Sequence, residues 1–318
     1  MAGATRFRNA ALIYNPLAGR RRDRRLRDLA RAVDLLAGYG LSVTLVATPG
    51  PGGATELARQ ELADGRDLLI VCGGDGTINE VVNGMVGSQV PLAILPAGTG
   101  NVLAKELGLP WNIWRAAEYI PAGVVRRIAL GRAASSELGE RHFISVAGAG
   151  ADANLIYRLS QKAKLSLGML SFWLEGLRQL ALYDFREFMV QADGQGLPAA
   201  LVVVGRTRHY GGPIEITRRA SLFRDDFEVA IFPRRPRAIY LLYLLAQWAG
   251  LLERFPGVRF VRAHRVVARP FGLAPGKPFS QPVYAQTDGE LCGHLPVEFT
   301  IVPDALSLLV PSALPADN

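Results

Sequence analysis

The chain of 318 residues is 49% hydrophobic and 20% charged, with a net charge of +8. This composition excludes a wholly disordered chain, and two cysteines are too few for a disulfide-stapled secreted scaffold or a cysteine-rich zinc site. The length is enough for about two domains, and the positive charge allows nucleic acid, anionic lipid or phosphorylated small molecules as partners.

Between residues 11 and 107, a short apolar run, a loop rich in glycine or proline and a helical pattern follow one another four times. The predicted strands are 11–14, 42–47, 67–72 and 92–95, and the helices that follow them end near residues 37, 63, 85 and 107. This alternation predicts a parallel sheet with helices on both faces, in which ligands bind at the carboxyl ends of the strands.

After residue 124, short strands separated by turns predominate, which predicts a mainly antiparallel β-sandwich. The predicted strands are 125–130, 142–147, 185–191, 200–205, 227–232, 258–267, 283–286 and 297–302, with helices at 155–182 and 238–253. We therefore predict an α/β protein with a Rossmann-like parallel-sheet domain at 1–127 and a β-sandwich domain at 128–302.

No segment is predicted to cross a membrane. The longest apolar run, 238–252, is shorter than the ~20 residues that a span requires, and it contains Gln247. We interpret this run as a buried helix, with a helix lying in a membrane interface as the alternative. The apolar run at the N-terminus is too short for the core of a signal peptide, so we expect a cytosolic protein.

The strongest motif is LIVCGGDGTINEVVNG at 69–84. A buried strand leads into Gly73, Gly74, Asp75, Gly76 and Thr77 and then into a helix. The glycines let the backbone turn sharply, so that N–H groups and the helix N-terminus face an anion. A turn that binds nothing, with Asp75 as a helix cap, is the alternative. A second loop of the same kind favours phosphate binding.

That second loop is PAGTG at 96–100, which follows the next strand. Asn101 is predicted to cap the helix after it. Neither loop has the lysine of a Walker A sequence or the spacing of a dinucleotide fingerprint. The loop NPLAG at 15–19 and Thr48 are predicted at the same edge of the sheet, and the loops together suit a polyphosphate.

Near the C-terminus, QTDGE at 286–290 lies between two predicted strands. Asp-Gly is a common hairpin turn, so a simple β-turn is one interpretation. The other is a compact pair of carboxylates, Asp288 and Glu290, of which one serves as a general base toward a hydroxyl while its neighbour orients it or binds Mg²⁺.

The Arg-rich segment 20–31 has no aromatic stacking residues beside it, which favours a solvated face or attraction to anionic membrane over nucleic acid.

Taken in order, these motifs resemble the diacylglycerol kinase catalytic family, the soluble bacterial lipid kinases that are similar to sphingosine and ceramide kinases. The resemblance rests on NP..G at 15–19, GGDGTINE at 73–80, LPAGTGN at 95–101 and TDGE at 287–290, and it spans nearly the whole chain. It implies a nucleotide-binding domain at 1–127, a lipid-substrate domain at 128–302, and ATP between them. It also implies that 303–318 returns to the first domain.

The resemblance also implies roles for individual residues. Glu290 matches the proton acceptor, with Asp288 beside it, and we count Asp75 with them as a catalytic carboxylate. The residues expected to bind ATP are Asn15, Pro16, Leu17, Ala18, Gly19, Thr48, Gly74, Asp75, Gly76, Thr77, Ile78, Asn79, Glu80 and Thr99.

This chain departs from the sequence pattern of the family at two places. Both concern an auxiliary Mg²⁺ site that acidic residues form in some members of the family. At the corresponding positions this chain has Ala129, Phe223 and Arg224. We therefore predict that this site is absent and that Mg²⁺ arrives only with ATP. The alternative is a shifted Mg²⁺ site formed by Asp225 or Asp226.

The predicted function is ATP-dependent phosphorylation of a hydroxyl of diacylglycerol or a related lipid. The alternatives are a sphingoid-, ceramide- or phosphatidylglycerol-type lipid kinase, a kinase of a soluble substrate like the NAD kinases, which share GGDG, and a non-catalytic regulator that binds lipid or nucleotide. The lipid is expected at a membrane surface with peripheral membrane contact. Nucleic acid is not expected as a partner, and a homodimer is left open.

Overall fold

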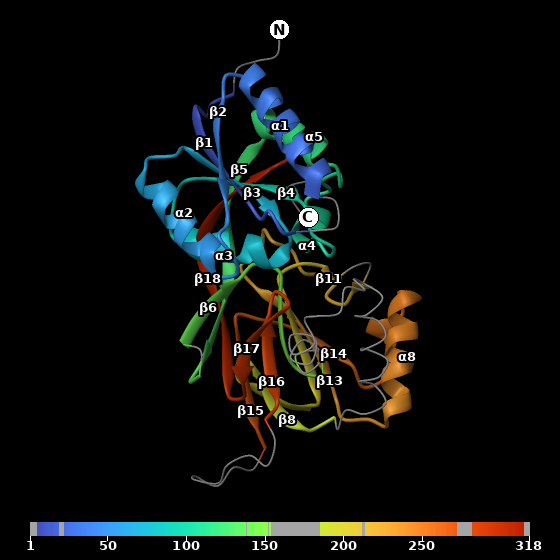
Figure 1. The fold of residues 1–318 in the computed structure, drawn as a ribbon. Coiled ribbons are helices and arrows are strands. Elements are labelled where there is room, and N and C mark those ends of the chain that lie inside the picture. The colour runs from blue at the N-terminus through green and yellow to red at the C-terminus, as the bar shows by residue number, and fades with distance from the viewer. Residues whose placement is uncertain are drawn as a thin grey trace. The chain divides into compact units, whose positions relative to one another are not determined.

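A computed structural model gives the fold, which divides into two compact units (Figure 1). The structure describes residues 5–18, 22–137, 139–151, 153, 185–211, 214–271 and 282–314. The first unit comprises 1–130, 221–224 and 302–318, and the second comprises 131–220 and 225–301. Gly19 and the predicted helix 155–182 lie outside the described residues.

The first unit contains the predicted parallel sheet, with strand order β2-β1-β3-β4. Its strands are β1 (Asn9–Tyr14), β2 (Ser42–Ala47), β3 (Leu68–Gly73) and β4 (Leu92–Pro96). β3 and β4 are buried along their whole lengths, as expected of parallel strands covered on both faces. Tyr14 pairs with Cys72 and Gly73 pairs with Pro96, so the strands end together at one edge.

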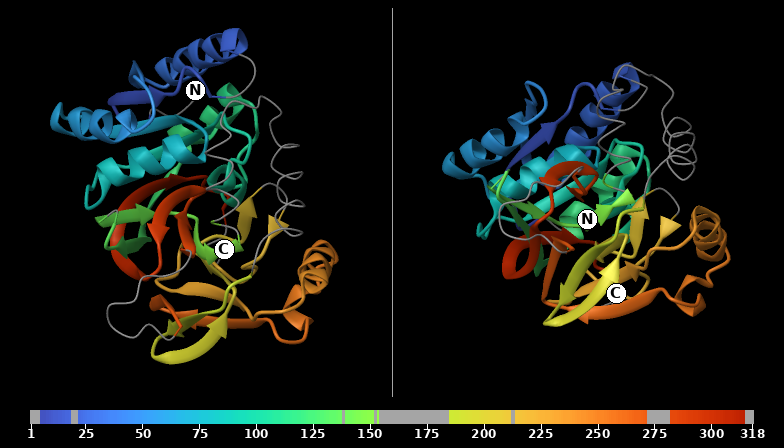
Figure 2. Two further views of the ribbon diagram at one scale, coloured as in Figure 1. Left: turned by 60° about the horizontal axis from the view of Figure 1, so that its bottom comes forward. Right: turned by 90° about the horizontal axis from the view of Figure 1, so that it is seen from below.

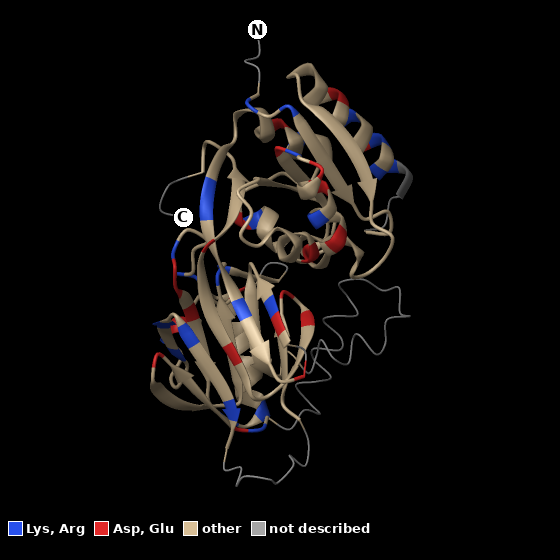
Figure 3. Ribbon diagram, turned by 90° about the vertical axis from the view of Figure 1, so that its left-hand side faces the viewer, with Lys and Arg blue, Asp and Glu red and all other residues tan. Residues whose placement is uncertain are grey.

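Helices cover both faces of this sheet. They are α1 (Arg22–Gly38), α2 (Gly53–Ala63), α3 (Asp75–Met85), α4 (Val102–Glu106), α5 (Ile113–Ala116) and the 3₁₀ helix η1 (Ala117–Ala122). α1, α5 and η1 share one core with the strands, whereas α2 and α3 contact β1 and β3 from the other side (Figure 1). Figure 3 shows Arg and Asp residues spaced along α1. At Gly84 a Cβ atom would lie 2.4 Å from the carbonyl oxygen of Thr55, so α2 and α3 need glycine there to approach this closely.

The second unit is the antiparallel sandwich that the sequence predicts. One sheet has the order β14-β13-β10-β7-β16-β17, and β18-β15-β8-β9 with β5 and β6 form the other layer (Figure 2). The bounds are β5 Val124–Ser135, β6 Gly139–Phe143, β7 Val146–Gly150, β8 Phe188–Ala192, β9 Gln195–Ala199, β10 Leu201–Gly205, β11 His209–Gly211, β12 Ile214–Glu215, β13 Phe227–Phe232, β14 Arg259–Ala263, β15 Arg265–Pro270, β16 Tyr284–Thr287, β17 Glu290–His294 and β18 Val297–Val310.

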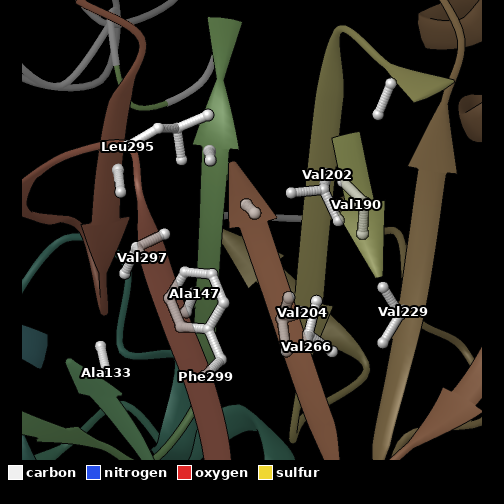
Figure 4. Close-up of a cluster of buried hydrophobic side chains, with 14 of the residues drawn as sticks. Ala133, Ala147, Val190, Val202, Val204, Val229, Val266, Leu295, Val297 and Phe299 are labelled. Atoms are coloured by element: carbon white, nitrogen blue, oxygen red, sulfur yellow. The ribbon is translucent and has the colours of Figure 1, made fainter. Parts of the chain in front are cut away.

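An apolar core joins the two layers of the second unit. Figure 4 shows part of it, with Ala147, Val204 and Val229 from one sheet and Val266 and Phe299 from the other. All five residues are fully buried, so each contributes hydrophobic stabilisation to this unit.

Several predicted strands differ from the observed ones, most clearly at three places. The predicted strand 142–147 is two strands, because the N–H groups of Ile144 and Ser145 between them bond the Asp288 carboxylate. The predicted strand 258–267 is likewise two strands, which meet at His264, whose N–H bonds Asp193. β18 is longer than predicted. Its first half pairs with β15 in the second unit, and its last residues pair in parallel with β4 at Leu308 in the first unit.

The interpretation of 238–252 as a buried helix is wrong. The segment forms α8 (Arg237–Trp248) followed by the 3₁₀ helix η2 (Leu252–Arg254), at the periphery of the second unit (Figures 1 and 2). In α8 only Tyr240 and Tyr243 are buried. None of the helices in the described ranges is both long enough and apolar enough to span a bilayer.

Candidate active site

Four loops leave the carboxyl edge of the parallel sheet in the first unit. They begin at Asn15 after β1, Thr48 after β2, Gly74 after β3 and Ala97 after β4. The N–H of Asn15 bonds the carbonyl of Cys72, and the N–H of Thr48 bonds that of Tyr14. The predicted convergence of these loops at one edge is therefore confirmed.

The two glycine loops touch through their backbones. A Cβ atom on Gly98 would lie 2.5 Å from the Cα of Gly74, closer than any ordinary contact. The N–H of Ala97 also donates to the carbonyl of Gly73 at 2.9 Å. Glycine is therefore required at this contact because a side chain would push the two loops apart.

Polar side chains then lock the loops together. The Asn15 amide donates to the Thr77 hydroxyl at 3.2 Å. The Asp75 carboxylate accepts the N–H of Val102, the first residue of α4, at 2.7 Å. Asn101 lies at the predicted N-cap position of α4, but its amide oxygen accepts the N–H of Gly98 at 2.8 Å.

This arrangement presents the N-terminus of α3 at the edge of the sheet. α3 begins at Asp75 after an extended Gly74, which as the N-cap residue has no side chain to cap the helix. The first-turn N–H groups of a helix have no acceptor within the helix, and they carry the positive end of its dipole. Backbone of this kind, held by neighbouring loops, suits a phosphate group.

The other residues predicted to bind a nucleotide divide into two groups. Pro16, Leu17, Ala18 and Thr99 lie in the loops at the same edge, whereas Ile78 and Asn79 are buried inside the first turns of α3. Glu80 follows Asn79 directly in α3.

The Glu80 carboxylate is already used within the fold. It accepts the N–H groups of Gly52 at 2.8 Å and Ala54 at 2.9 Å, and so caps α2, while the Thr55 hydroxyl bonds the Glu80 carbonyl. These contacts fix the loop that contains Thr48, and they make Glu80 a residue that positions this loop.

Three charged side chains surround the loops. Burial raises the pKa of Asp75, while the Val102 N–H and the charge of Lys105 act in the opposite direction. Burial lowers the pKa of Lys105, and Asp75 opposes that shift. Arg25 is buried and donates to the carbonyls of Asn15 and Pro16 at 2.9 and 3.0 Å. Neither Lys105 nor Arg25 was among the residues predicted from the sequence.

In the second unit, the predicted hairpin turn between β16 and β17 is confirmed. Asp288 and Gly289 both have positive φ, 47° and 81°, which is the geometry of the two-residue turn that Asp-Gly favours. The turn places Glu290 at the start of β17, where its side chain is 38% exposed and forms an ion pair with Arg141 of β6. Arg141 could not be predicted as a partner of Glu290, because a lone arginine in a strand carries no motif.

The Asp288 carboxylate holds the hairpin to the neighbouring chain. It accepts the N–H groups of Ile144, Ser145 and Val146 at 2.8–2.9 Å. Three backbone N–H donors therefore occupy most of the acceptor capacity of the Asp288 carboxylate. These contacts give Asp288 a structural role, whereas the Glu290 carboxylate stays partly exposed beside Arg141.

Replacing Asp288 with asparagine is expected to lower the free energy of unfolding by about 2–4 kcal/mol, because the amide keeps only one acceptor oxygen and loses the charge-assisted bonds. Asparagine tolerates the positive φ, so the change isolates the carboxylate. Urea denaturation measures the difference. Wild-type stability in D288N would contradict this structural role.

Comparison with known proteins places these features in a family. The family model of the diacylglycerol kinase catalytic domain matches residues 9–133, and that of the YegS C-terminal NAD kinase beta sandwich-like domain matches residues 145–310. The chain belongs to the diacylglycerol kinase family. The interlocked loops thus lie in the part matched by the catalytic-domain model, and the Glu290 hairpin lies in the part matched by the second.

Individual members of the diacylglycerol kinase family match along almost the whole chain. The diacylglycerol kinase of Bacillus subtilis (strain 168) is 29% identical over 310 residues, 96% of this chain and 97% of the relative. That of Staphylococcus carnosus (strain TM300) is 26% identical, covering 96% and 95%. A crystal structure of a diacylglycerol kinase from Bacillus anthracis str. Sterne has a TM-score of 0.75 at 26% identity, covering 97% of this chain and 99% of that one.

The residues at the auxiliary metal positions do not suit a cation. Ala129 is buried, and the ring of Phe223 lies beneath the guanidinium of Arg126, with 4.6 Å from its carbon to the ring centroid. Asp226 forms an ion pair with Arg262 at 3.0 Å. Among the described residues, no group of three or more His, Cys, Asp or Glu could hold a metal ion. The absence of an auxiliary Mg²⁺ stays a prediction.

The raised pKa of Asp75 predicts a pH dependence of stability. The folded protein binds a proton at Asp75 more tightly than the unfolded chain does. The free energy of unfolding therefore falls as the pH rises from the ordinary pKa of an aspartate, near 4, through the raised pKa of Asp75 in the folded protein. We expect the D75N variant, which cannot ionise, to gain stability relative to wild type across this window. Denaturation curves from pH 4 to pH 8 test this, and parallel stability profiles would contradict it.

Proposed function

We propose that this protein transfers the γ-phosphoryl group of ATP to a hydroxyl of diacylglycerol or a related lipid. The observation that carries the proposal is the interlocking of two glycine loops at the N-terminus of α3, in a chain of the diacylglycerol kinase family. Such a site favours a chain of phosphates over a neutral ligand.

In this proposal the loops hold the phosphates of ATP. The glycine backbone at 73–76 and 97–100 lets phosphate oxygens approach the N–H groups of α3 and of the second loop. Asn15, Thr77 and Asp75 keep these groups in place through the contacts described above. Mg²⁺ bound with the nucleotide would neutralise charge on the transferring phosphoryl group.

Glu290 is the proposed general base. The acceptor oxygen of the lipid forms a bond to the γ-phosphorus while the bond from that phosphorus to the bridging oxygen of ADP breaks, and the hydroxyl proton passes to the Glu290 carboxylate. Arg141 orients this carboxylate through their ion pair. We expect the lipid to be taken from a membrane surface, because a diacylglycerol is almost insoluble in water.

Incubation with ATP labelled at the γ-phosphate and a panel of lipids tests the proposal. The panel contains diacylglycerol, monoacylglycerol, sphingosine, ceramide and phosphatidylglycerol, with NAD as a soluble acceptor. Label in diacylglycerol supports the proposal in full, and label in another lipid alone corrects the substrate. Label in NAD, or no release of ADP with any acceptor, overturns it in favour of a soluble-substrate kinase or a non-catalytic binding protein.

A further inference from the structure

The outer face of α8 is apolar where a helix at the protein surface is normally charged. It consists of Leu241, Leu242, Leu245 and Trp248, and Leu251 continues it beyond the helix. All five side chains are exposed, Leu245 by 59% and Trp248 by 67%. Positions 241, 245 and 248 follow the helical repeat, so these side chains project from one side. We call these five residues the α8 outer face.

The opposite face of α8 fixes the helix to the second unit. Tyr240 and Tyr243 are buried, and the ring of Tyr243 packs edge-on against Phe255 with a centroid distance of 5.1 Å. The Tyr240 hydroxyl donates to the carbonyl of Pro233 at 3.0 Å, and the Gln247 amide donates to that of Glu215. The inner side of α8 therefore accounts for its packing, and the outer leucines and Trp248 take no part in this core.

Arginines precede and follow the α8 outer face along the chain. Residues 234–259 contain five arginines, Arg234, Arg235, Arg237, Arg254 and Arg259, and all five are exposed. The only acidic residue in this range is Glu253, which pairs with Arg219 at 2.6 Å. An exposed apolar helix face with tryptophan and leucine, with exposed arginines before and after it in the chain, suits a bilayer with anionic headgroups. Apolar side chains are favourable among acyl chains, and arginines are favourable beside lipid phosphates.

We infer that α8 is a membrane-docking helix, whose outer face inserts into the headgroup region of a bilayer that contains anionic phospholipid. A peptide groove would not need arginines on both sides of the apolar residues. A second copy of this chain would bring its own arginines to the interface, where like charges repel. The inference deepens the proposed function: that α8 brings the protein to a lipid substrate rests on that function. Binding to vesicles, however, is measurable without nucleotide or turnover.

Vesicle flotation of the full chain tests the inference. Wild type and the variant L245Q/W248Q are mixed with vesicles of phosphatidylcholine alone or with phosphatidylglycerol added. We expect wild type to bind the mixed vesicles and L245Q/W248Q to bind at least about ten-fold more weakly, because two side chains lose their burial in lipid. The variant L26Q/L45Q, which removes two exposed leucines from the first unit, is the matched control and should bind like wild type.

The contribution of charge is tested separately. R254Q/R259Q is expected to reduce binding to the mixed vesicles several-fold and to weaken its dependence on phosphatidylglycerol. R27Q/R31Q removes two exposed arginines from α1 and should have a smaller effect. Equal losses in the two variants would mean that overall charge, and not α8, attracts the membrane, which overturns the inference.

Tryptophan fluorescence reports insertion directly. Phospholipids with brominated acyl chains should quench part of the wild-type emission on vesicle binding, and W248F should lose this component while circular dichroism shows it folded. Quenching that is unchanged in W248F overturns the inference. The inference is also overturned if wild type is a dimer in analytical ultracentrifugation while L245Q/W248Q is a monomer that still binds vesicles. A second copy of the chain would then occupy the α8 outer face.

Phosphorylation assays separate failure of this inference from failure of the proposed function. L245Q/W248Q should phosphorylate a short-chain, water-soluble diacylglycerol at the wild-type rate and lose activity on long-chain diacylglycerol in vesicles. If wild type phosphorylates no lipid but docks through α8, the proposed function fails and the docking helix stands. Equal activity of both proteins on vesicles, with equal binding, overturns the docking helix alone.

Discussion

Replacing Glu290 with glutamine is expected to lower kcat by about 10²–10⁴-fold, because the amide cannot take the proton of the acceptor hydroxyl. The affinity for ATP should stay near the wild-type value, since the proposed nucleotide contacts lie in the loops after β1, β2, β3 and β4. The unfolding free energy should change by less than about 1 kcal/mol, because the Arg141–Glu290 pair is partly exposed. Steady-state kinetics and equilibrium ATP binding check both parts.

The matched control for this variant is E298Q. Glu298 is also a strand carboxylate paired with an arginine, Arg265, at 2.7 Å, but it lies on β18, away from the Asp-Gly turn. It should keep wild-type kcat, because only Glu290 is assigned to proton transfer. A normal rate in E290Q, or an equal loss in E298Q, would contradict the assignment of Glu290 as the base.

Replacing Gly98 with alanine is expected to weaken ATP binding at least about ten-fold and to lower the free energy of unfolding by about 1–3 kcal/mol. The new Cβ would lie 2.5 Å from the Cα of Gly74 and 3.0 Å from the Asn101 amide oxygen. Because the nearest atom belongs to backbone, the loops must separate, and the phosphate site separates with them. Isothermal titration with ATP and urea denaturation measure the two effects.

Two glycine variants calibrate this prediction. In G74A the new Cβ lies 3.3 Å from the Cα of Gly98, a tight contact that a small shift relieves, so we expect an intermediate loss. At Gly38, at the end of α1, a Cβ meets no atom within 4 Å, so G38A should behave as wild type. If G98A and G38A bound ATP equally well, the contact between the loops would have no role in nucleotide binding.

The first unit could be predicted closely from the sequence because its signals are local. β3 and β4 are continuous apolar runs that end in glycine loops, and such runs identify strands of a parallel sheet. Parallel pairing then brings all the loops to one edge without further information. The Asp-Gly turn was predictable for the same reason, since its geometry depends on two adjacent residues.

Contacts between distant residues could not be predicted in this way. The break between β6 and β7 depends on a carboxylate more than 140 positions away, at Asp288, and the ion pair of Glu290 depends on Arg141. The motif at 73–80 likewise gave no sign that Glu80 caps α2 through Gly52 and Ala54. Each of these roles is set by which strands and helices become neighbours in the fold.

The error at α8 has a different physical cause. An apolar run with leucines on all sides predicts burial, because hydrophobic residues are usually inside a soluble protein. The second unit covers only the side that carries Tyr240 and Tyr243. A membrane gives the same pattern as a protein core, so composition alone could not separate the two environments.

A crystal structure with a non-hydrolysable ATP analogue and a diacylglycerol tests the central claim most directly. The account predicts the phosphates on the first-turn N–H groups of α3, and the lipid hydroxyl between the γ-phosphate and Glu290, within about 3 Å of its carboxylate. Phosphates bound away from Gly74 and Gly98, or a Glu290 carboxylate remote from the lipid hydroxyl, would contradict it.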